Sequence, residues 1–407
     1  MTTKKILIAL VAAAAAAPAW AQVPDDPQTA LNGDCGSFRN VSVYGKDNRT
    51  DYCSRDAVLR GLADSVVSLF NSGGLTRNGG SYVFGTTTLM NSPDHVSAGQ
   101  RFSDEPAAAF CTGFLVGDDL VATAGHCVKD HPAAPAAGGK PSKSCAENLN
   151  MGDYCENIKF VFGFRKELGG FLPASVPAAN VYSCASVVLH SKKSGPDYTI
   201  VRLDRKVTDR MPLAINRGNA GLSAGVPLIV MGHPSGLPLK IADDAEVTGT
   251  GDVYVNNGGT QLKWSDKRYS FLTNLDTFHG NSGSPVFNAR TLLVEGILVS
   301  GDGDYEPDPD NPGSTRVSTY TQAGHNPNLG QGVGEVCTKI SVPARAIPAN
   351  GREKTMLELD RKANGDLYGA LLRRLKKAAA AGSPSGIIPI PNYVPPPSAS
   401  QPHVTFI

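Results

Sequence analysis

The sequence predicts an all-β protein. Its 44 glycines and 29 prolines favour a turn-rich chain over a helical one. Between residues 81 and 345, short apolar runs alternate with clusters of Gly, Pro, Asn and Asp, at intervals typical of β-barrels and β-sandwiches. These runs are 114–116, 120–122, 160–162, 187–189, 199–201, 228–231, 269–272 and 296–299. A chain of 407 residues with 41% hydrophobic content is long enough for one large domain, or two, with additional flanking segments.

The first 21 residues have the pattern of a secretory signal peptide. Lys4 and Lys5 supply the positive start, residues 6–17 are apolar, and Ala19-Trp20-Ala21 fits a small-x-small cleavage site. The apolar stretch is too short to span a bilayer, and no other segment approaches the roughly 20 apolar residues that a spanning helix needs. The sequence therefore predicts a secreted or periplasmic protein without stable membrane insertion.

The segments that flank the β-rich region differ from it in composition. Residues 22–80 are polar and turn-rich, with helical spacing of apolar residues over 57–70. This N-terminal segment is either a removable pro-segment or an integral arm, and the sequence leaves both open. Residues 346–381 have the pattern of a surface helix, and residues 382–407 form a Pro-rich tail that we expect to be disordered.

The charge and the cysteines limit the possible partners. The net charge is +1 and the only polybasic run lies at 373–377, so nucleic acid is not an expected partner. All 8 cysteines follow the signal peptide, an even number that predicts disulfides in an exported protein. No Cys-x-x-Cys or His-x-x-x-His spacing occurs, so neither a metal nor a cofactor is predicted. The sequence does not indicate an oligomeric state.

The stretch 276–287 has the composition of a turn that presents a nucleophile. Ser282 lies between Gly280 and Gly283, which permit backbone conformations closed to other residues and a close approach of substrate. The N–H groups of Gly280 and Ser282 are candidates for an oxyanion hole. Position 284 is Ser, so the stretch departs from the Gly-x-Ser-x-Gly elbow of α/β-hydrolases.

Two other stretches offer the partners that a nucleophilic serine needs. A neutral imidazole is the natural base for a serine hydroxyl, and His126 is followed by Cys127, with Cys111 16 residues before it. A disulfide from Cys111 to Cys127 would fix the backbone beside His126. Asp197 precedes the apolar run 199–201, where an acid can hold the imidazole in the correct tautomer. Asp204 is the competing acid, but it follows the run.

In the order His126, Asp197, Ser282, these motifs resemble the chymotrypsin-like serine peptidases over roughly residues 100–340. The motif Gly-Asn-Ser-Gly-Ser-Pro at 280–285, together with the segments 231–236 and 44–49, is most similar to the bacterial glutamyl-endopeptidase-like branch of this family. The resemblance implies two packed six-stranded antiparallel β-barrels over residues 81–345, and hydrolysis of peptide bonds in protein or peptide substrates through an acyl-enzyme.

The resemblance also implies roles for particular residues. Ser282 is the nucleophile, His126 the base and then the acid, and Asp197 the acid that orients the imidazole. The N–H groups of Gly280 and Ser282 form the oxyanion hole, and Ser300 and Gly301 lie beside the substrate backbone and the primary specificity pocket.

Three positions bear on activation and specificity. Asn281 stands where trypsin-like enzymes place an Asp before the serine, so the buried ion pair that activates their zymogens cannot form. The strand 297–299 lacks the histidine of glutamyl endopeptidases, which counts against a glutamate preference. Asp276 lies six residues before Ser282, the offset of the pocket acid in trypsin-like enzymes, and therefore predicts a preference for Lys or Arg.

Further disulfides and other functions remain open from the sequence. Cys145–Cys155 and Cys35–Cys53 would each close a short loop, and Cys184–Cys337 follows by elimination. The alternatives to an endopeptidase are a catalytically inactive binding protein with the protease fold and an esterase that uses the same three residues.

Overall fold

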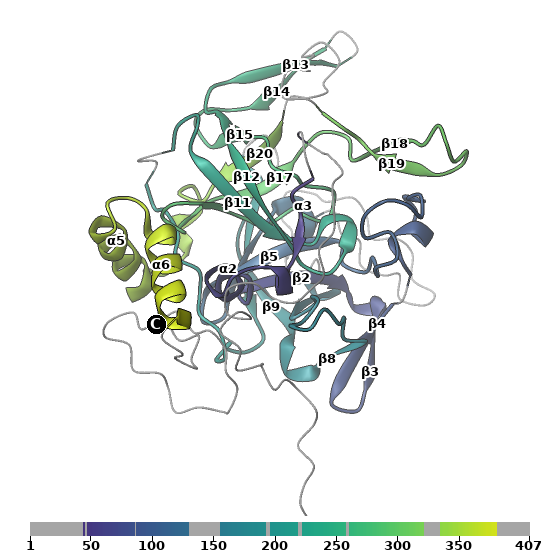
Figure 1. The fold of residues 1–407 in the computed structure, drawn as a ribbon, viewed down its shortest axis with the longest axis horizontal. Coiled ribbons are helices and arrows are strands. Elements are labelled where there is room, and N and C mark those ends of the chain that lie inside the picture. Colours follow the sequence, from purple (N-terminus) through teal and green to yellow (C-terminus); the bar gives the residue numbers. More distant parts are fainter. Residues whose placement is uncertain are drawn as a thin grey trace, which may run out of the picture.

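The computed structural model describes most of the chain between residues 44 and 380 (Figure 1). The described residues are 44, 47–85, 87–129, 155–192, 196–218, 222–257, 260–320 and 334–380. The predicted signal peptide and the Pro-rich tail lie outside them. None of the helices within these ranges is long and apolar enough to cross a membrane.

The first barrel is a closed antiparallel sheet of six strands. In order around the barrel these are β10 (Tyr198–Leu203), β6 (Leu120–Thr123), β5 (Cys111–Gly117), β2 (Val66–Asn71), β7 (Ile158–Phe162) and β9 (Val181–Ser191). Alternate residues of β2 face different clusters: Val67 and Leu69 pack inside the barrel, whereas Val66 and Phe70 pack outside it. Both faces of this strand are therefore buried, which explains its nearly continuous apolar sequence.

The second barrel also has six strands, and the pairing of β12 with β15 closes it. The strands follow one another as β12 (Lys240–Gly249), β11 (Pro227–Gly232), β16 (Pro285–Asn288), β17 (Val294–Ser300), β20 (Glu335–Lys339) and β15 (Ser270–Thr273). A short strand, β1 (Thr50–Asp51), adds to the outer edge of β12. The predicted all-β, chymotrypsin-like architecture of two six-stranded barrels is confirmed.

Smaller sheets and short helices extend from the barrels (Figure 1). The sheets are the hairpin of β13 (Val253–Asn257) and β14 (Thr260–Ser265), the hairpin of β18 (Tyr305–Pro307) and β19 (Thr315–Val317), and the trio β3 (Leu75–Asn78), β4 (Ser81–Phe84) and β8 (Ser175–Pro177). The short helices are α3 (Gly125–Lys129) and six 3-10 turns, at Tyr52–Ser54, Ser72–Gly74, Leu89–Asn91, Ala178–Asn180, Pro234–Gly236 and Ala344–Ala346.

The apolar spacing over 57–70 forms a helix only in its first half. Helix α2 (Ala57–Ala63) begins after Asp56, whose carboxylate accepts the N–H groups of Val58 and Leu59. Residues from Val66 onward belong to β2 instead, because β-branched residues there pair on both sides within the first barrel. The first barrel therefore includes Val66–Asn71, which belong to the segment 22–80 that we expected to precede the β-rich region.

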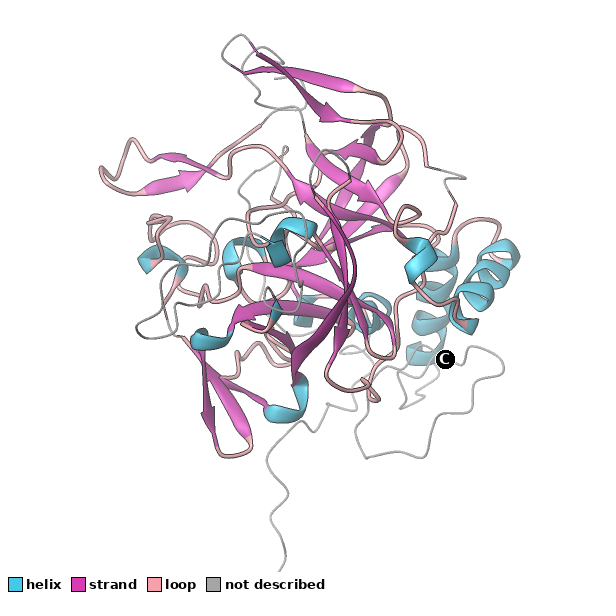
Figure 2. Ribbon diagram, turned by 180° about the vertical axis from the view of Figure 1, so that it is seen from behind, coloured by secondary structure: helices cyan, strands magenta, loops and turns pink. Residues whose placement is uncertain are grey.

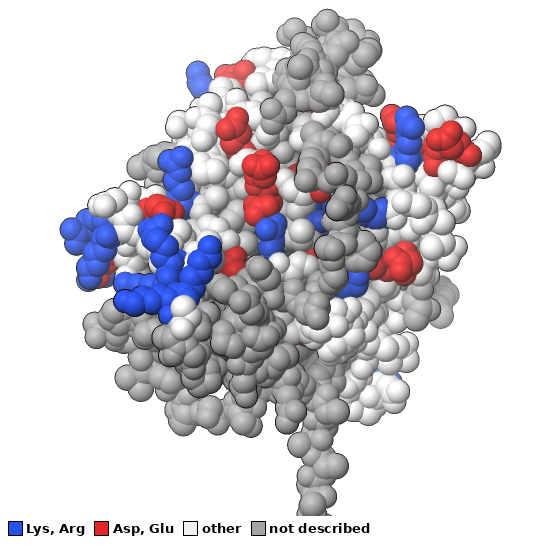
Figure 3. Space-filling model, viewed as in Figure 1, with Lys and Arg blue, Asp and Glu red and all other residues white. Residues whose placement is uncertain are grey.

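The C-terminal helical segment is a hairpin of two helices, α5 (Gly351–Lys362) and α6 (Leu367–Ala380). The helical conformation is interrupted between them at Asn364 and Gly365, which have φ angles of 56° and 79°. Their buried apolar residues join α2 in the core cluster that includes residues of both barrels. Figure 2 shows the hairpin on the opposite side of the molecule from β18 and β19. Lys and Arg side chains gather over this hairpin (Figure 3).

Candidate active site

The first barrel positions His126 and Asp197 next to each other. His126 is the second residue of α3, and Asp197 immediately precedes β10. Asp197 accepts the main-chain N–H of His126 at 3.1 Å through Oδ1, and its Oδ2 lies 2.9 Å from the imidazole Nδ1. Because a carboxylate accepts, Nδ1 carries the hydrogen and a neutral imidazole keeps Nε2 as an acceptor. The competing acid Asp204 instead pairs with Arg205 on the surface.

The residue before His126 has to be a glycine. A Cβ atom on Gly125 would lie 2.3 Å from the carbonyl oxygen of Ser191 and 2.8 Å from Oδ1 of Asp197. Any side chain at this position would therefore force Asp197 away from the main chain of His126.

Ser282 lies on a sharp turn of the second barrel, between β15 and β16. Gly280 and Gly283 have φ angles of 87° and 93°, a region that favours glycine. A Cβ atom on Gly283 would lie 2.0 Å from the carbonyl oxygen of Thr112, so the turn packs directly on β5. Among the described residues, no hydrogen bond uses the N–H of Gly280 or Ser282, and none joins the hydroxyl of Ser282 to the ring of His126.

Hydrogen bonds between the barrels hold the serine turn beside α3. Thr112 donates its N–H to the carbonyl of Ser282 at 2.9 Å and its hydroxyl to the carbonyl of Gly280 at 2.8 Å. Sγ of Cys127, the residue after His126, lies 3.5 Å from the same Ser282 oxygen. In the opposite direction, the Thr338 hydroxyl of β20 donates to the carbonyl of Asp197 at 2.9 Å. The roles of both threonines were not predicted from the sequence, because each depends on a contact between the two barrels.

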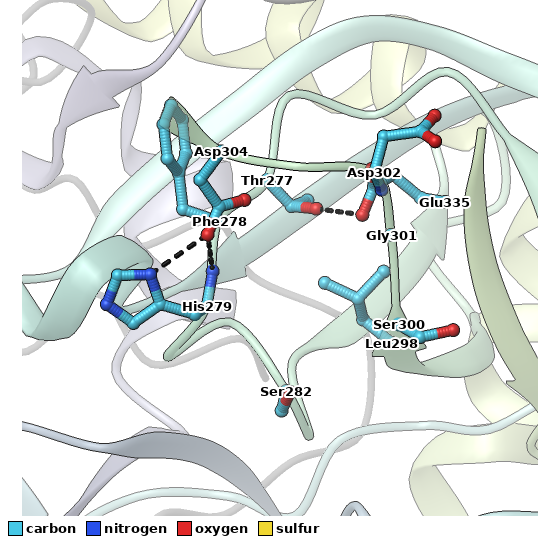
Figure 4. Close-up of a pocket in the computed structure, with 10 residues that line it drawn as sticks. All are labelled: Thr277, Phe278, His279, Ser282, Leu298, Ser300, Gly301, Asp302, Asp304 and Glu335. Atoms are coloured by element: carbon cyan, nitrogen blue, oxygen red, sulfur yellow. Dashed lines mark hydrogen bonds and ion pairs between the residues drawn. The ribbon is translucent and has the colours of Figure 1, made fainter. Parts of the chain in front are cut away.

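A pocket of about 180 Å³ opens beside Ser282 (Figure 4). Its wall comes from the serine turn, the end of β17, the following loop and the start of β20. The lining residues are Thr277, Phe278, His279, Ser282, Leu298, Ser300, Gly301, Asp302, Asp304 and Glu335. Ser300 and Gly301, which we expected near the substrate, are among them.

Asp276, which we expected at the floor of the pocket, does not line it. Its carboxylate is buried and accepts two main-chain N–H groups, those of Tyr44 and Asn48, at 3.0 Å each. Burial raises the pKa of Asp276 to about 6, although the two hydrogen bonds oppose the rise. The six-residue offset from the serine leads to the wrong role, because the N-terminal segment occupies this carboxylate.

His279, three residues before Ser282, carries a charge at the pocket rim. Its Nδ1 lies 2.9 Å from Oδ2 of Asp304, and its Nε2 lies 3.2 Å from Oδ2 of Asp94. Burial alone would lower the pKa of His279, but hydrogen bonds to the two carboxylates outweigh it and raise the pKa to about 10. The imidazolium therefore balances the negative charge of Asp304.

The described disulfides agree only in part with the sequence predictions. Cys111 and Cys127 form a disulfide beside His126, as expected. Cys155 pairs with Cys184, so the predicted pairs Cys145–Cys155 and Cys184–Cys337 are wrong. The reason is that β7 and β9 are neighbours in the barrel, which brings the start of one strand to Cys184 of the other.

Cys337 and Cys53 lie outside these two disulfides, and one cluster beside His126 has metal-ligand atom types. Cys337 is a buried free thiol within the second barrel. Cys53 is disulfide-bonded, and the prediction that Cys35 is its partner falls on a residue outside the described ones. Potential ligand atoms of Cys111, His126 and Cys127 lie within 4.8 Å of one another, but both cysteines are in a disulfide and offer no thiolate.

A comparison with known protein families found a match for the part of the chain that carries His126, Asp197 and Ser282. Residues 111–297 match the family model described as a trypsin-like peptidase domain. This part of the chain, which includes strands of both barrels and the three residues His126, Asp197 and Ser282, is therefore similar to trypsin-like peptidase domains. No curated protein matches the sequence.

Two solved structures are similar at low identity. The VesB protease of Vibrio cholerae is 14% identical, with 73% of this chain and 65% of that chain covered and a TM-score of 0.38. The Rv3671c protease of M. tuberculosis in its active form is 13% identical, with 72% and 85% covered and a TM-score of 0.35.

Proposed function

We propose that the protein is an exported serine endopeptidase that hydrolyses peptide bonds through an acyl-enzyme. The observation that carries the proposal is the hydrogen-bonded pair of His126 and Asp197, with the turn of Ser282 pinned beside it in a trypsin-like peptidase domain. The signal-peptide pattern of residues 1–21 and the two described disulfides of the first barrel support export.

In the proposed reaction, Oγ of Ser282 attacks the scissile carbonyl while Nε2 of His126 takes the hydroxyl proton. Asp197 stabilises the imidazolium through Nδ1–H. The N–H groups of Gly280 and Ser282 donate to the oxyanion. His126 then protonates the leaving amine, and a water molecule activated by the same imidazole hydrolyses the acyl-enzyme.

The specificity that we propose is a preference for Lys or Arg before the scissile bond. The pocket beside Ser282 contains Asp302, Asp304 and Glu335, and among the described residues no Lys or Arg lines it. The similarity to the glutamyl-endopeptidase-like branch does not predict a preference for glutamate, because the strand residues Ile297, Leu298 and Val299 include no histidine.

A fluorophosphonate probe tests the nucleophile directly. The purified full chain and its Ser282→Ala and His126→Gln variants are treated with the probe, and intact mass reports labelling. We expect labelling of the wild type alone, because only an activated serine reacts. Labelling only after trimming of the segment before residue 44 would indicate a zymogen. If no processed form is labelled, the protein is a binding protein with the protease fold, and the proposal is wrong.

A further inference from the structure

We propose that Glu335 and Asp302 together bind the cationic side chain of the substrate residue before the scissile bond, and that Tyr44 positions them. This inference rests on the proposed function, since it names the residues that give the peptidase its specificity. It replaces Asp276 in that role.

Glu335 and Asp302 lie in the same pocket as Ser282. Figure 4 shows the serine at one end of this pocket and the two acidic residues at the other. Gly301, the residue before Asp302, also lines the pocket. A Cβ atom on Gly301 would lie 1.9 Å from Oε2 of Glu335. The absence of a side chain at residue 301 thus allows the carboxylate of Glu335 to approach the main chain that borders the pocket.

Asp302 and Glu335 differ from the other acids nearby, which are paired with cations of the described chain. Asp304 is paired with His279, and Glu306 on the adjacent hairpin is paired with Arg316. Within the described part of the chain, no Lys, Arg or His forms an ion pair with Asp302 or Glu335.

The donors that reach the pair are neutral. The Thr277 hydroxyl donates to Oε2 of Glu335, and the N–H of Gly334 donates to Oδ2 of Asp302 at 3.0 Å. Oδ1 of Asp302 is a buried acceptor with no hydrogen-bond partner among the described residues. Burying a carboxylate costs free energy unless it is paired with a cation or a hydrogen-bond donor. A positively charged donor in the pocket would therefore stabilise both acids.

Tyr44 of the N-terminal segment connects the two acids. Its hydroxyl lies 2.7 Å from Oδ2 of Asp302 and 3.2 Å from Oε1 of Glu335. Its main-chain N–H is held by Asp276 at 3.0 Å. Asp276 therefore anchors the segment, and the phenol of Tyr44 in turn sets the spacing of the pocket carboxylates.

The electrostatics of Glu335 fit a site that receives a cation. Burial raises its pKa well above the ordinary value, and the negative charges of Asp304 and Asp302 add to the effect. A guanidinium or ammonium group would offset both causes and supply charge-assisted hydrogen bonds. The geometry thus suits a Lys or Arg side chain and disfavours an acidic one.

The test measures cation binding separately from catalysis. Benzamidine, a planar amidinium, is titrated calorimetrically into the full chain carrying Ser282→Ala. Adding Glu335→Gln or Asp302→Asn should weaken its binding at least tenfold, whereas Glu306→Gln, a matched carboxylate-to-amide change on the adjacent hairpin outside the pocket, should weaken it less than threefold. Circular dichroism verifies that each variant is folded, and if Glu335→Gln does not fold, Asp302→Asn decides.

Peptide cleavage by the enzyme with Ser282 intact supplies the second measurement. The ratio of kcat/KM for peptides with Arg and with its neutral isostere citrulline should fall at least tenfold in Glu335→Gln. Tyr44→Phe should lower the same ratio through KM, with kcat for the citrulline peptide and fluorophosphonate labelling unchanged. Labelling without a preference for Arg over citrulline would overturn this inference and leave the proposed function standing. Absence of labelling would instead overturn the proposed function.

Discussion

Asp276 is a buried carboxylate whose two oxygens accept the N–H groups of Tyr44 and Asn48. Burial raises its pKa from the ordinary 3.8 to about 6, with a smaller contribution of the same sign from the charge of Asp47. Arg49, whose guanidinium is paired with Asp47, acts in the opposite direction. Between pH 4 and pH 6 the folded protein therefore binds more protons at Asp276 than the unfolded chain does, and the contribution of this residue to stability falls as the pH rises.

Replacement of Asp276 by Asn should remove this dependence on pH. The rise in pKa corresponds to roughly 3 kcal/mol at most, so the free energy of unfolding of Asp276→Asn relative to wild type should increase by up to that amount from pH 4 to pH 7. The NH2 group of the introduced Asn cannot accept a hydrogen bond, so one of the two main-chain N–H groups loses its acceptor. This loss of stability is the same at every pH. Urea denaturation of both proteins at several pH values measures the difference. A difference that is constant with pH would show that Asp276 has an ordinary pKa.

The two described disulfides of the first barrel join different elements. Cys111–Cys127 connects the start of β5 to α3 and spans 16 residues, whereas Cys155–Cys184 connects the residues before β7 to β9 and spans 29. In the chain-entropy model, loops of these lengths each contribute about 3 kcal/mol to stability. Only the first disulfide contains a neighbour of His126.

The paired variants Cys111→Ala/Cys127→Ala and Cys155→Ala/Cys184→Ala should therefore lose similar stability but differ in reactivity. Guanidinium denaturation should give a loss of about 3 kcal/mol for each pair. The rate of fluorophosphonate labelling of Ser282 should fall at least tenfold for the first pair only, because α3 loses its covalent anchor. Equal labelling rates in both variants would mean that hydrogen bonds alone hold His126 in place.

At the scale of the secondary-structure elements, the features that could be predicted from the sequence are those that depend on neighbouring residues in the chain. The alternation of apolar runs and turns predicted an all-β fold, and the motifs around His126, Asp197 and Ser282 drew attention to the three loops that the barrels bring together. The spacing over 57–70 was ambiguous, because a strand buried on both faces has apolar residues at helical spacing as well. The pairing of Cys155 with Cys184 depends on which strands are neighbours, which no local pattern encodes.

At the scale of the whole molecule, the candidate site belongs to neither barrel alone. The first barrel carries His126 and Asp197, and the second carries Ser282 and the pocket. The N-terminal segment adds Tyr44, which reaches acids more than 250 residues away in the sequence. The role of Glu335 was not predictable from the sequence for this reason: its place in the pocket follows from the position of β20 in the closed barrel and from Gly301 beside it.

Thr112 is the residue through which the docking of the two barrels can be tested. Its buried hydroxyl donates to the carbonyl of Gly280 at 2.8 Å and accepts the N–H of His233 at 3.0 Å. Thr112→Val preserves the shape but leaves both buried main-chain groups of the second barrel without a partner, at about 1–3 kcal/mol each. Because the released turn carries Ser282, the rate of fluorophosphonate labelling should fall at least tenfold. Ser68→Ala, which removes a buried hydroxyl that donates to the carbonyl of Val161 within the first barrel, should lower the stability but not the labelling rate. Slow labelling in both variants would mean that general destabilisation, and not the junction between the barrels, controls the serine.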